Sequence, residues 1–262
     1  MTRFVTSAIS LPRLARVVAL AGFSLTMVAA ATESGRAQSV VEAFLTWQRM
    51  NCADNASCNA NAYKIEWRGA KHAVSGSEFS AIARTVIDGP NGYLMIDDEG
   101  TGGGNSVTES AIFRPAFGPA LFVIATRTYE TYSPRTGTLA VYRWDGSTLT
   151  PTPELLPKPE PRDFVPGIDT KHVTGLERSD DSWNETVFYL PRKGIKIDAY
   201  LLRFDMDLCI QDDWLGLPDA MRSASCGLAA KGYSPSMTLI FDKAQGRFRR
   251  GPLGTKRAPA LR

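Results

Sequence analysis

The feature that most constrains the fold is a series of six short segments rich in β-branched and aromatic residues. They are Gly92–Asp98, Ala120–Glu130, Thr138–Trp144, Glu185–Leu190, Ile195–Phe204 and Met237–Asp242. In the fifth segment, aliphatic residues alternate with more polar ones, the pattern of a half-buried strand. The aliphatic positions are Ile195, Ile197, Ala199 and Leu201.

Turn signals join several of these segments: Gly89–Gly92, Asp145–Gly146, Pro191–Gly194 and Lys243–Gly246. Asn-Gly and Asp-Gly tolerate the positive φ that tight hairpins require. The spacing is irregular, so a propeller or a solenoid is not indicated. We therefore predict a mainly β fold, an antiparallel, hairpin-rich sandwich or barrel-like domain.

One helix is expected before the strands. Ser39 and Glu42 form a capping box. Apolar residues follow at helical spacing, so residues 39–51 are predicted to be a short amphipathic helix. These apolar residues are Val40, Val41, Phe44, Leu45 and Met50.

The segment Pro151–Pro166 has six prolines in sixteen residues. Proline lacks a backbone N–H, so we expect extended, polyproline-like chain rather than a ladder strand or a helix interior. The segment either separates two β halves or crosses the surface of one. Because the predicted strands are few for two cores, residues 38–250 are predicted to form a single β-rich domain with this crossover.

The first 37 residues have the organisation of a secretory signal peptide. Arginines precede the uncharged stretch Val17–Ala31, which is shorter than the roughly 20 apolar residues of a membrane span. Cleavage is expected after Ala31 or Ala37, and an uncleaved anchor is the alternative. The mature chain is predicted to be periplasmic or secreted, without a transmembrane span.

The four cysteines are expected to form disulfides in that oxidising compartment. They are Cys52, Cys58, Cys209 and Cys226. No two have C-x-x-C spacing, and neither histidine lies at ligand spacing from a cysteine, so zinc and redox motifs are not indicated. Four cysteines allow three pairings. The sequence favours Cys52–Cys58 and Cys209–Cys226, with unpaired buried cysteines as the alternative.

Charge is unevenly distributed. Without residues 1–37 the chain has 26 basic and 26 acidic side chains, whereas its last sixteen residues have six basic and no acidic ones. A nucleic-acid-binding protein would show a basic patch over its folded domain, so nucleic acid is not an expected partner. Residues 251–262 are predicted to be a disordered basic tail, which could make weak contact with an anionic surface.

Two acidic clusters are the candidates for chemistry. Asp97, Asp98 and Glu99 end a predicted strand, and a second group of acids surrounds Cys209. Oxygen ligands can hold calcium, although neither cluster has EF-hand spacing. Paired carboxylates could instead hydrolyse glycosides, and solvated strand-end carboxylates are the simplest interpretation. The weak metal candidates are Asp205, Asp207, Asp212 and Asp213.

Other motifs lack the context that their chemistry needs. The glycine run Glu99–Asn105 has no Gly-Lys-Ser/Thr and indicates a hairpin tip. Gly232–Ser236 is close to G-x-S-x-G but precedes a strand, whereas a nucleophile elbow lies between a strand and a helix. The five tryptophans are interpreted mainly as core. We predict no catalytic or cofactor-binding residue and no cofactor.

The order of "NGYLMIDD", "ALFVIAT", "LAVYRWDGSTL" and "PELLP" over residues 91–157 resembles a strand order of uncharacterised secreted bacterial β-rich proteins. There an Asn-Gly-Tyr-Leu strand precedes an Ala-Leu-Phe strand and an aromatic hairpin. The resemblance implies bacterial export, and it carries no information on activity.

The expected function is that of an exported, non-enzymatic binding or envelope-associated protein, whose ligand and partners the sequence does not identify. The alternative is a secreted hydrolase that uses paired acidic residues. Two acids facing each other across an aromatic-lined cleft would favour the hydrolase, and scattered acids the binding protein.

Overall fold

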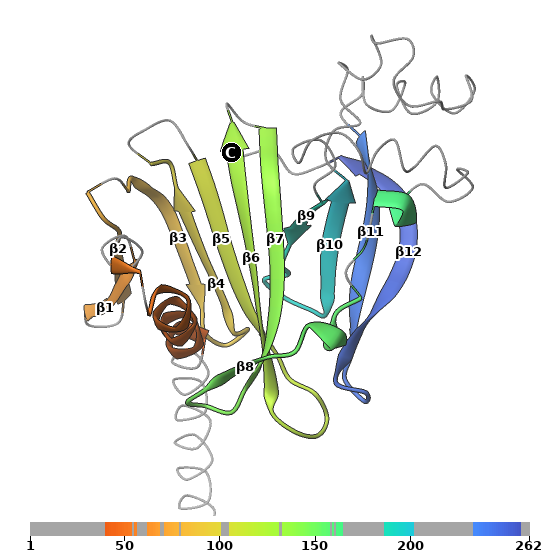
Figure 1. Cartoon of the computed structure of the whole chain (residues 1–262), viewed down its shortest axis with the longest axis horizontal. Coiled ribbons are helices and arrows are strands. Elements are labelled where there is room, and N and C mark those ends of the chain that lie inside the picture. The colour runs from red at the N-terminus through yellow and green to blue at the C-terminus, as the bar shows by residue number, and fades with distance from the viewer. Residues whose placement is uncertain are drawn as a thin grey trace, which may run out of the picture.

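The structure is a computed structural model, and it confirms the mainly β fold with antiparallel sheets and one helix packed beside them (Figure 1). It describes residues 40–53, 55–56, 62–68, 71–78, 80–100, 105–130, 133–157, 159, 161–164, 186–201 and 233–257.

Among the described residues the strands form three sheets, all with antiparallel neighbours. A small sheet pairs β1 (Lys64–Arg68) with β2 (Lys71–Ser75). A six-stranded sheet follows chain order: β3 (Ile82–Asp88), β4 (Tyr93–Asp98), β5 (Asn105–Phe113), β6 (Ala120–Glu130), β7 (Ser133–Trp144) and β8 (Leu149–Pro151). A four-stranded sheet has the order β12-β11-β10-β9, with β9 (Thr186–Tyr189), β10 (Lys196–Leu201), β11 (Tyr233–Asp242) and β12 (Arg247–Arg257).

The predicted turns join neighbouring strands. Gly92, Gly146, Gly194 and Gly246 have φ of 64°, 104°, 104° and 63°, the region that glycine adopts most easily. Strand β4 ends at Asp98 and its antiparallel partner β5 begins at Asn105. Residues 101–104 of the glycine run between them lie outside the described part of the chain, so the predicted hairpin tip stays a prediction.

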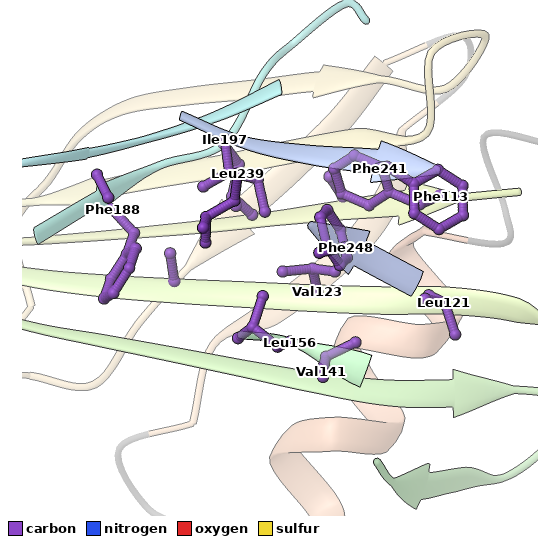
Figure 2. Close-up of a cluster of buried hydrophobic side chains, with 14 of the residues drawn as sticks. Phe113, Leu121, Val123, Val141, Leu156, Phe188, Ile197, Leu239, Phe241 and Phe248 are labelled. Carbon is purple, nitrogen blue, oxygen red and sulfur yellow. The ribbon is translucent and has the colours of Figure 1, made fainter. Parts of the chain in front are cut away.

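The main core lies between the six- and four-stranded sheets, which makes the fold sandwich-like (Figure 2). The inward residues of β10 are those that the alternation predicted, because Ile197, Ala199 and Leu201 are all buried. Phe248 of β12 also faces this core: it is 3% exposed, and its ring centroid lies 4.9 Å from that of Phe113.

A second apolar layer lies on the other face of the six-stranded sheet. The helix of residues 40–52 packs Val40, Val41 and Phe44 in one cluster with Leu94 and Phe122. The predicted amphipathic helix is confirmed except at Met50, which is 40% exposed. Within the part of the chain that the structure describes, no helix combines the length and apolar character needed to cross a bilayer.

The proline-rich crossover is not the extended segment that we predicted. Two short 3-10 helices form within it, η1 (Pro153–Leu155) and η2 (Pro161–Phe164). Proline at a first helical position loses no hydrogen bond, which reconciles η1 and η2 with the composition. Leu156 and Phe164 are buried in the main core. The crossover lies against β7 at η1 and β11 at η2, so it connects the two sheets.

The predicted disordered tail is also wrong for residues 251–257. β12 continues to Arg257, which pairs with Tyr233 of β11. An irregularity opposite Met237–Leu239 accommodates Gly251 and Pro252, as β-bulges on edge strands commonly do for proline. Residues 258–262 lie outside the described part.

Candidate functional site

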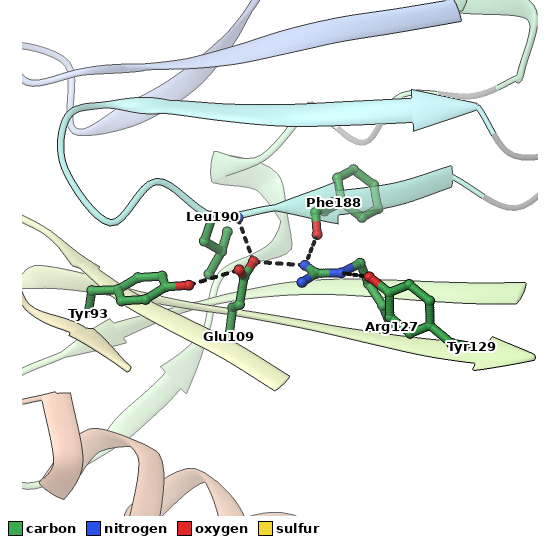
Figure 3. A network of polar contacts seen from close by, with 6 residues as sticks. All are labelled: Tyr93, Glu109, Arg127, Tyr129, Phe188 and Leu190. Carbon is green, nitrogen blue, oxygen red and sulfur yellow. Dashed lines mark hydrogen bonds and ion pairs between the residues drawn. The ribbon is translucent and has the colours of Figure 1, made fainter. Parts of the chain in front are cut away.

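A buried ion pair between the two larger sheets is the centre of a polar network (Figure 3). Glu109 on β5 and Arg127 on β6 occupy inward-facing positions, two residues from the core residues Ala111 and Ala125 respectively. Arg127 Nη1 lies 2.7 Å from Glu109 Oε2, and the two side chains are 3% and 7% exposed.

Aromatic side chains complete this network. The Tyr93 hydroxyl donates to Glu109 Oε1 at 2.8 Å, and Arg127 Nε donates to the Tyr129 hydroxyl oxygen at 3.1 Å. The Arg127 guanidinium carbon lies 4.1 Å from the centroid of the Tyr189 ring, within cation–π range.

The ion pair also binds the backbone at β9. The Leu190 N–H donates to Glu109 Oε2 at 2.8 Å, and Arg127 Nη1 donates to the Phe188 carbonyl at 2.5 Å. In its sheet β9 has one neighbour, β10, among the described strands. Side chains from β5 and β6 thus satisfy backbone groups that a further strand would otherwise pair.

Gly137 on β7 lets β9 approach the six-stranded sheet closely. A Cβ atom at this position would lie 2.6 Å from the Thr186 carbonyl oxygen and 2.8 Å from the Val187 Cα atom. Both are backbone atoms, so a larger residue would separate the sheets at the point where the ion pair connects them.

Electrostatics keep the network in one protonation state. Burial alone would lower the pKa of Arg127, but the adjacent Glu109 carboxylate raises it above its ordinary value. Burial and Glu109 also raise the pKa of Tyr93. Arg127 therefore stays cationic and Tyr93 stays a neutral donor, and this saturated network connects the two sheets rather than offering a reactive group.

The acidic residues Asp97 and Asp98 do not form a carboxylate pair. Asp97 follows Tyr93 and Met95 on the sandwich side of β4, whereas Asp98 lies on the helix side, where it accepts a hydrogen bond from the Tyr63 hydroxyl at 3.1 Å. The two-carboxylate geometry of glycosidases is not available to these neighbours.

The remaining predicted site residues lie mostly outside the described part of the chain. This holds for Cys58, Cys209 and Cys226, so the disulfide pairing stays a prediction, and Cys52 is buried at the end of the 40–52 helix. It also holds for the metal candidates Asp205, Asp207, Asp212 and Asp213. Among the described residues, no group of three or more His, Cys, Asp or Glu side chains could hold a metal ion.

The G-x-S-x-G-like segment was predicted to precede a strand, but its residues 233–236 form the first part of β11. Ser234 falls inside β11 and pairs with Lys256 of β12, so it is not on a strand-to-helix turn. Among the tryptophans, Trp144 is 4% exposed and belongs to the cluster under the helix.

Sequence reasoning missed both Glu109 and Arg127. Their signal was positional, because each charge interrupts the inward-facing series of its strand: Ala111 and Phe113 follow Glu109, and Val123 and Ala125 precede Arg127. A charged residue in such a series is uncommon in a core unless it is paired.

Two features of the surface lie outside this buried network. Strand β12 has basic side chains along an edge of the four-stranded sheet. Phe117, in the turn between β5 and β6, is 87% exposed.

Comparisons with known proteins identify no family. No family model and no curated protein matches the chain. Among solved structures, a domain of an uncharacterized protein from Porphyromonas gingivalis W83 is similar, with 11% identity and a TM-score of 0.37 over 66% of this chain and 80% of that one. A match this distant gives no information on function.

Proposed function

We propose that the chain is an exported, non-enzymatic binding protein of the bacterial envelope, which docks on an anionic surface through strand β12. The observation that carries this proposal is the composition of that strand: five of its eleven residues are basic and none is acidic. They are Arg247, Arg249, Arg250, Lys256 and Arg257.

Only part of this charge is neutralised within the described residues. Arg250 pairs with Asp163 at 2.7 Å and Lys256 with Asp198 at 2.8 Å. Arg247 donates to the Gln245 amide oxygen. For Arg247, Arg249 and Arg257 the described part of the chain supplies no acidic partner, so β12 retains an excess of positive charge.

The strand also fixes these charges in space. β12 pairs with β11 from Arg247 to Arg257, so its arginines project from an ordered backbone and less conformational entropy is lost on binding than with a tail. Attraction between exposed charges is screened beyond about 8 Å at physiological ionic strength. Binding should therefore weaken as salt concentration rises.

Export is supported by the organisation of residues 1–37, an arginine-containing start followed by the apolar stretch Val17–Ala31. Intact mass of the protein recovered from the cell envelope tests it, with a mature start at Thr32 or Gln38 expected. Peptide mapping without reduction should also show Cys52 linked to Cys58. A mass that retains residues 1–31 would contradict cleavage.

Binding to polyglutamate-coated beads tests the anionic docking. Arg249→Glu and Arg257→Glu should each weaken binding at low salt. Lys64→Glu is the matched control, because Lys64 is exposed on β1, in a different sheet. If Lys64→Glu weakens binding as much as the β12 variants, net charge rather than β12 is responsible, and the proposal fails.

A further inference from the structure

We propose that the turn between β5 and β6 is a membrane anchor, which inserts Phe117 into the headgroup region of an anionic bilayer. This inference rests on the proposed function and names the anionic surface as lipid. Residues 115–119, Pro-Ala-Phe-Gly-Pro, contain no polar side chain, and residues 116–119 are all exposed. Four consecutive exposed apolar residues are unusual in a soluble fold unless they serve a function.

The turn is held in place by its neighbour. The Ala116 N–H donates to the Lys243 carbonyl in the β11–β12 turn at 2.7 Å. Gly246 of that turn is close to Pro115, since a Cβ atom there would lie 3.3 Å from Pro115 Cβ. Two prolines fix φ within the loop. Phe117 is therefore presented to solvent by an ordered turn, and little entropy is lost when its ring is buried elsewhere.

Basic residues lie next to the apolar tip in the chain and in the turn that contacts it. Arg114 precedes it, Lys243 lies in the contacting turn, and Arg247 begins β12 from that same turn; all three are exposed. Asp242 is occupied in capping its own turn, where it accepts from the Ala244 and Gln245 N–H groups. An aromatic tip bordered by Lys and Arg is typical of segments that lie in a membrane interface.

The position of the helix fits contact of this end of the fold with a bilayer during export, before the signal peptide is cleaved. The 40–52 helix begins at the end of the molecule where the β5–β6 and β11–β12 turns lie (Figure 1). The apolar segment Val17–Ala31 ends nine residues before Val40. The end of the fold that carries Phe117 is thus the end nearest, along the chain, to the segment expected to enter the membrane during export.

Co-sedimentation with lipid vesicles tests the anchor, using the exported form of the chain. Vesicles of phosphatidylcholine mixed with phosphatidylglycerol should bind it, and phosphatidylcholine alone should bind it more weakly. Phe117→Ala should weaken binding to the mixed vesicles about tenfold, equivalent to about 1.4 kcal/mol, without changing the melting temperature. Phe117→Trp should restore binding, since tryptophan favours the same interface. Met50→Ala is the control, because Met50 is also exposed, at 40%, but lies near the end of the 40–52 helix and outside β12.

Three outcomes would overturn the anchor. If Phe117→Ala binds mixed vesicles as well as the unchanged chain while Arg249→Glu binds polyglutamate less well, the anchor is wrong and the proposed function stands. If Phe117→Ala weakens binding to polyglutamate as much as binding to vesicles, Phe117 makes no contact that is specific to lipid. If the unchanged chain binds neither vesicles nor polyglutamate, both proposals fail.

Discussion

Asp97 and Asp98 are consecutive in β4, yet their carboxyl groups lie on opposite faces of the sheet in opposite electrostatic environments. Asp97 is 8% exposed and its Oδ1 atom has no hydrogen-bond partner among the described residues. Asp98 accepts from the Ala81 and Gly100 N–H groups, both at 2.9 Å.

We predict that Asp97→Asn stabilises the protein by about 1 kcal/mol at neutral pH, because it removes a buried charge with an unpaired oxygen. Burial, reinforced by Glu99, raises the pKa of Asp97. The unfolded chain therefore ionises first as pH rises, and the unchanged protein loses stability from about pH 4 upward to the folded-state pKa. Urea unfolding as a function of pH should show the variant's advantage disappear below about pH 4. A constant advantage at all pH values would contradict this assignment.

Asp98→Asn should have the opposite effect and cost about 1–3 kcal/mol at neutral pH. Burial alone would raise the pKa of Asp98, but hydrogen bonds from Gly100, Ser80, Ala81 and Tyr63 hold it below its ordinary value. Such a carboxylate stabilises the fold above its unfolded-state pKa, and this stabilisation is lost as pH falls through its folded-state pKa. Urea unfolding as a function of pH should show that the stability lost in Asp98→Asn becomes smaller in acid. If Asp97→Asn and Asp98→Asn changed the stability in the same direction at neutral pH, the two-face arrangement would be wrong.

Some elements were predictable because their periodicity reflects their burial. The first half of β10 alternates, since Lys196 is exposed while Ile197 and Ala199 are buried, although Tyr200 is buried as well. β6 lies in the middle of the six-stranded sheet and reads as a continuous apolar run, which also identified it as a strand.

β5 was not predictable in the same way. Thr108 is 6% exposed and Ser110 fully buried, because the helix covers one face of this sheet and the four-stranded sheet covers the other. Polar residues buried by two layers give no alternation. The contacts of Glu109 and Arg127 with β9 join residues 61 to 81 positions apart, and local patterns do not contain that information.

We expect the Glu109–Arg127 pair to act as a unit. Arg127→Met should cost about 3–5 kcal/mol, because it leaves a buried carboxylate without its cation. Glu109→Gln should reduce the loss when combined with Arg127→Met, since the amide needs no counter-charge and can still accept from the Leu190 N–H. A double-mutant cycle by urea unfolding measures the coupling. Additive effects would show that the charges are independent.

The contact between β7 and β9 should be equally sensitive. Gly137→Ala is expected to cost about 1–3 kcal/mol, because the added methyl group would overlap the backbone of Thr186 and Val187. Gly254→Ala on β12 is the matched control, since the nearest atom to its Cβ would be Ser236 Oγ at 3.9 Å. Thermal melts should separate the two variants, and equal melting temperatures would contradict the close approach.

Truncation after Arg250 tests the corrected C-terminal strand. The deletion removes the pairing of residues 253–257 with β11, and each lost backbone hydrogen bond is worth about 0.5–1.5 kcal/mol. The deleted segment buries little apolar surface in the unchanged protein, because every residue from 252 to 257 is exposed. We therefore expect a clear fall in melting temperature that is smaller than that of Phe248→Ala, for which loss of a buried aromatic ring predicts about 3–5 kcal/mol. Truncation after Arg257 is the control, since it keeps all the β11–β12 pairs, and it should leave the melting temperature unchanged. If truncation after Arg250 also leaves it unchanged, residues 251–257 contribute nothing to stability, and the basic edge strand on which anionic docking depends is not an ordered part of the fold.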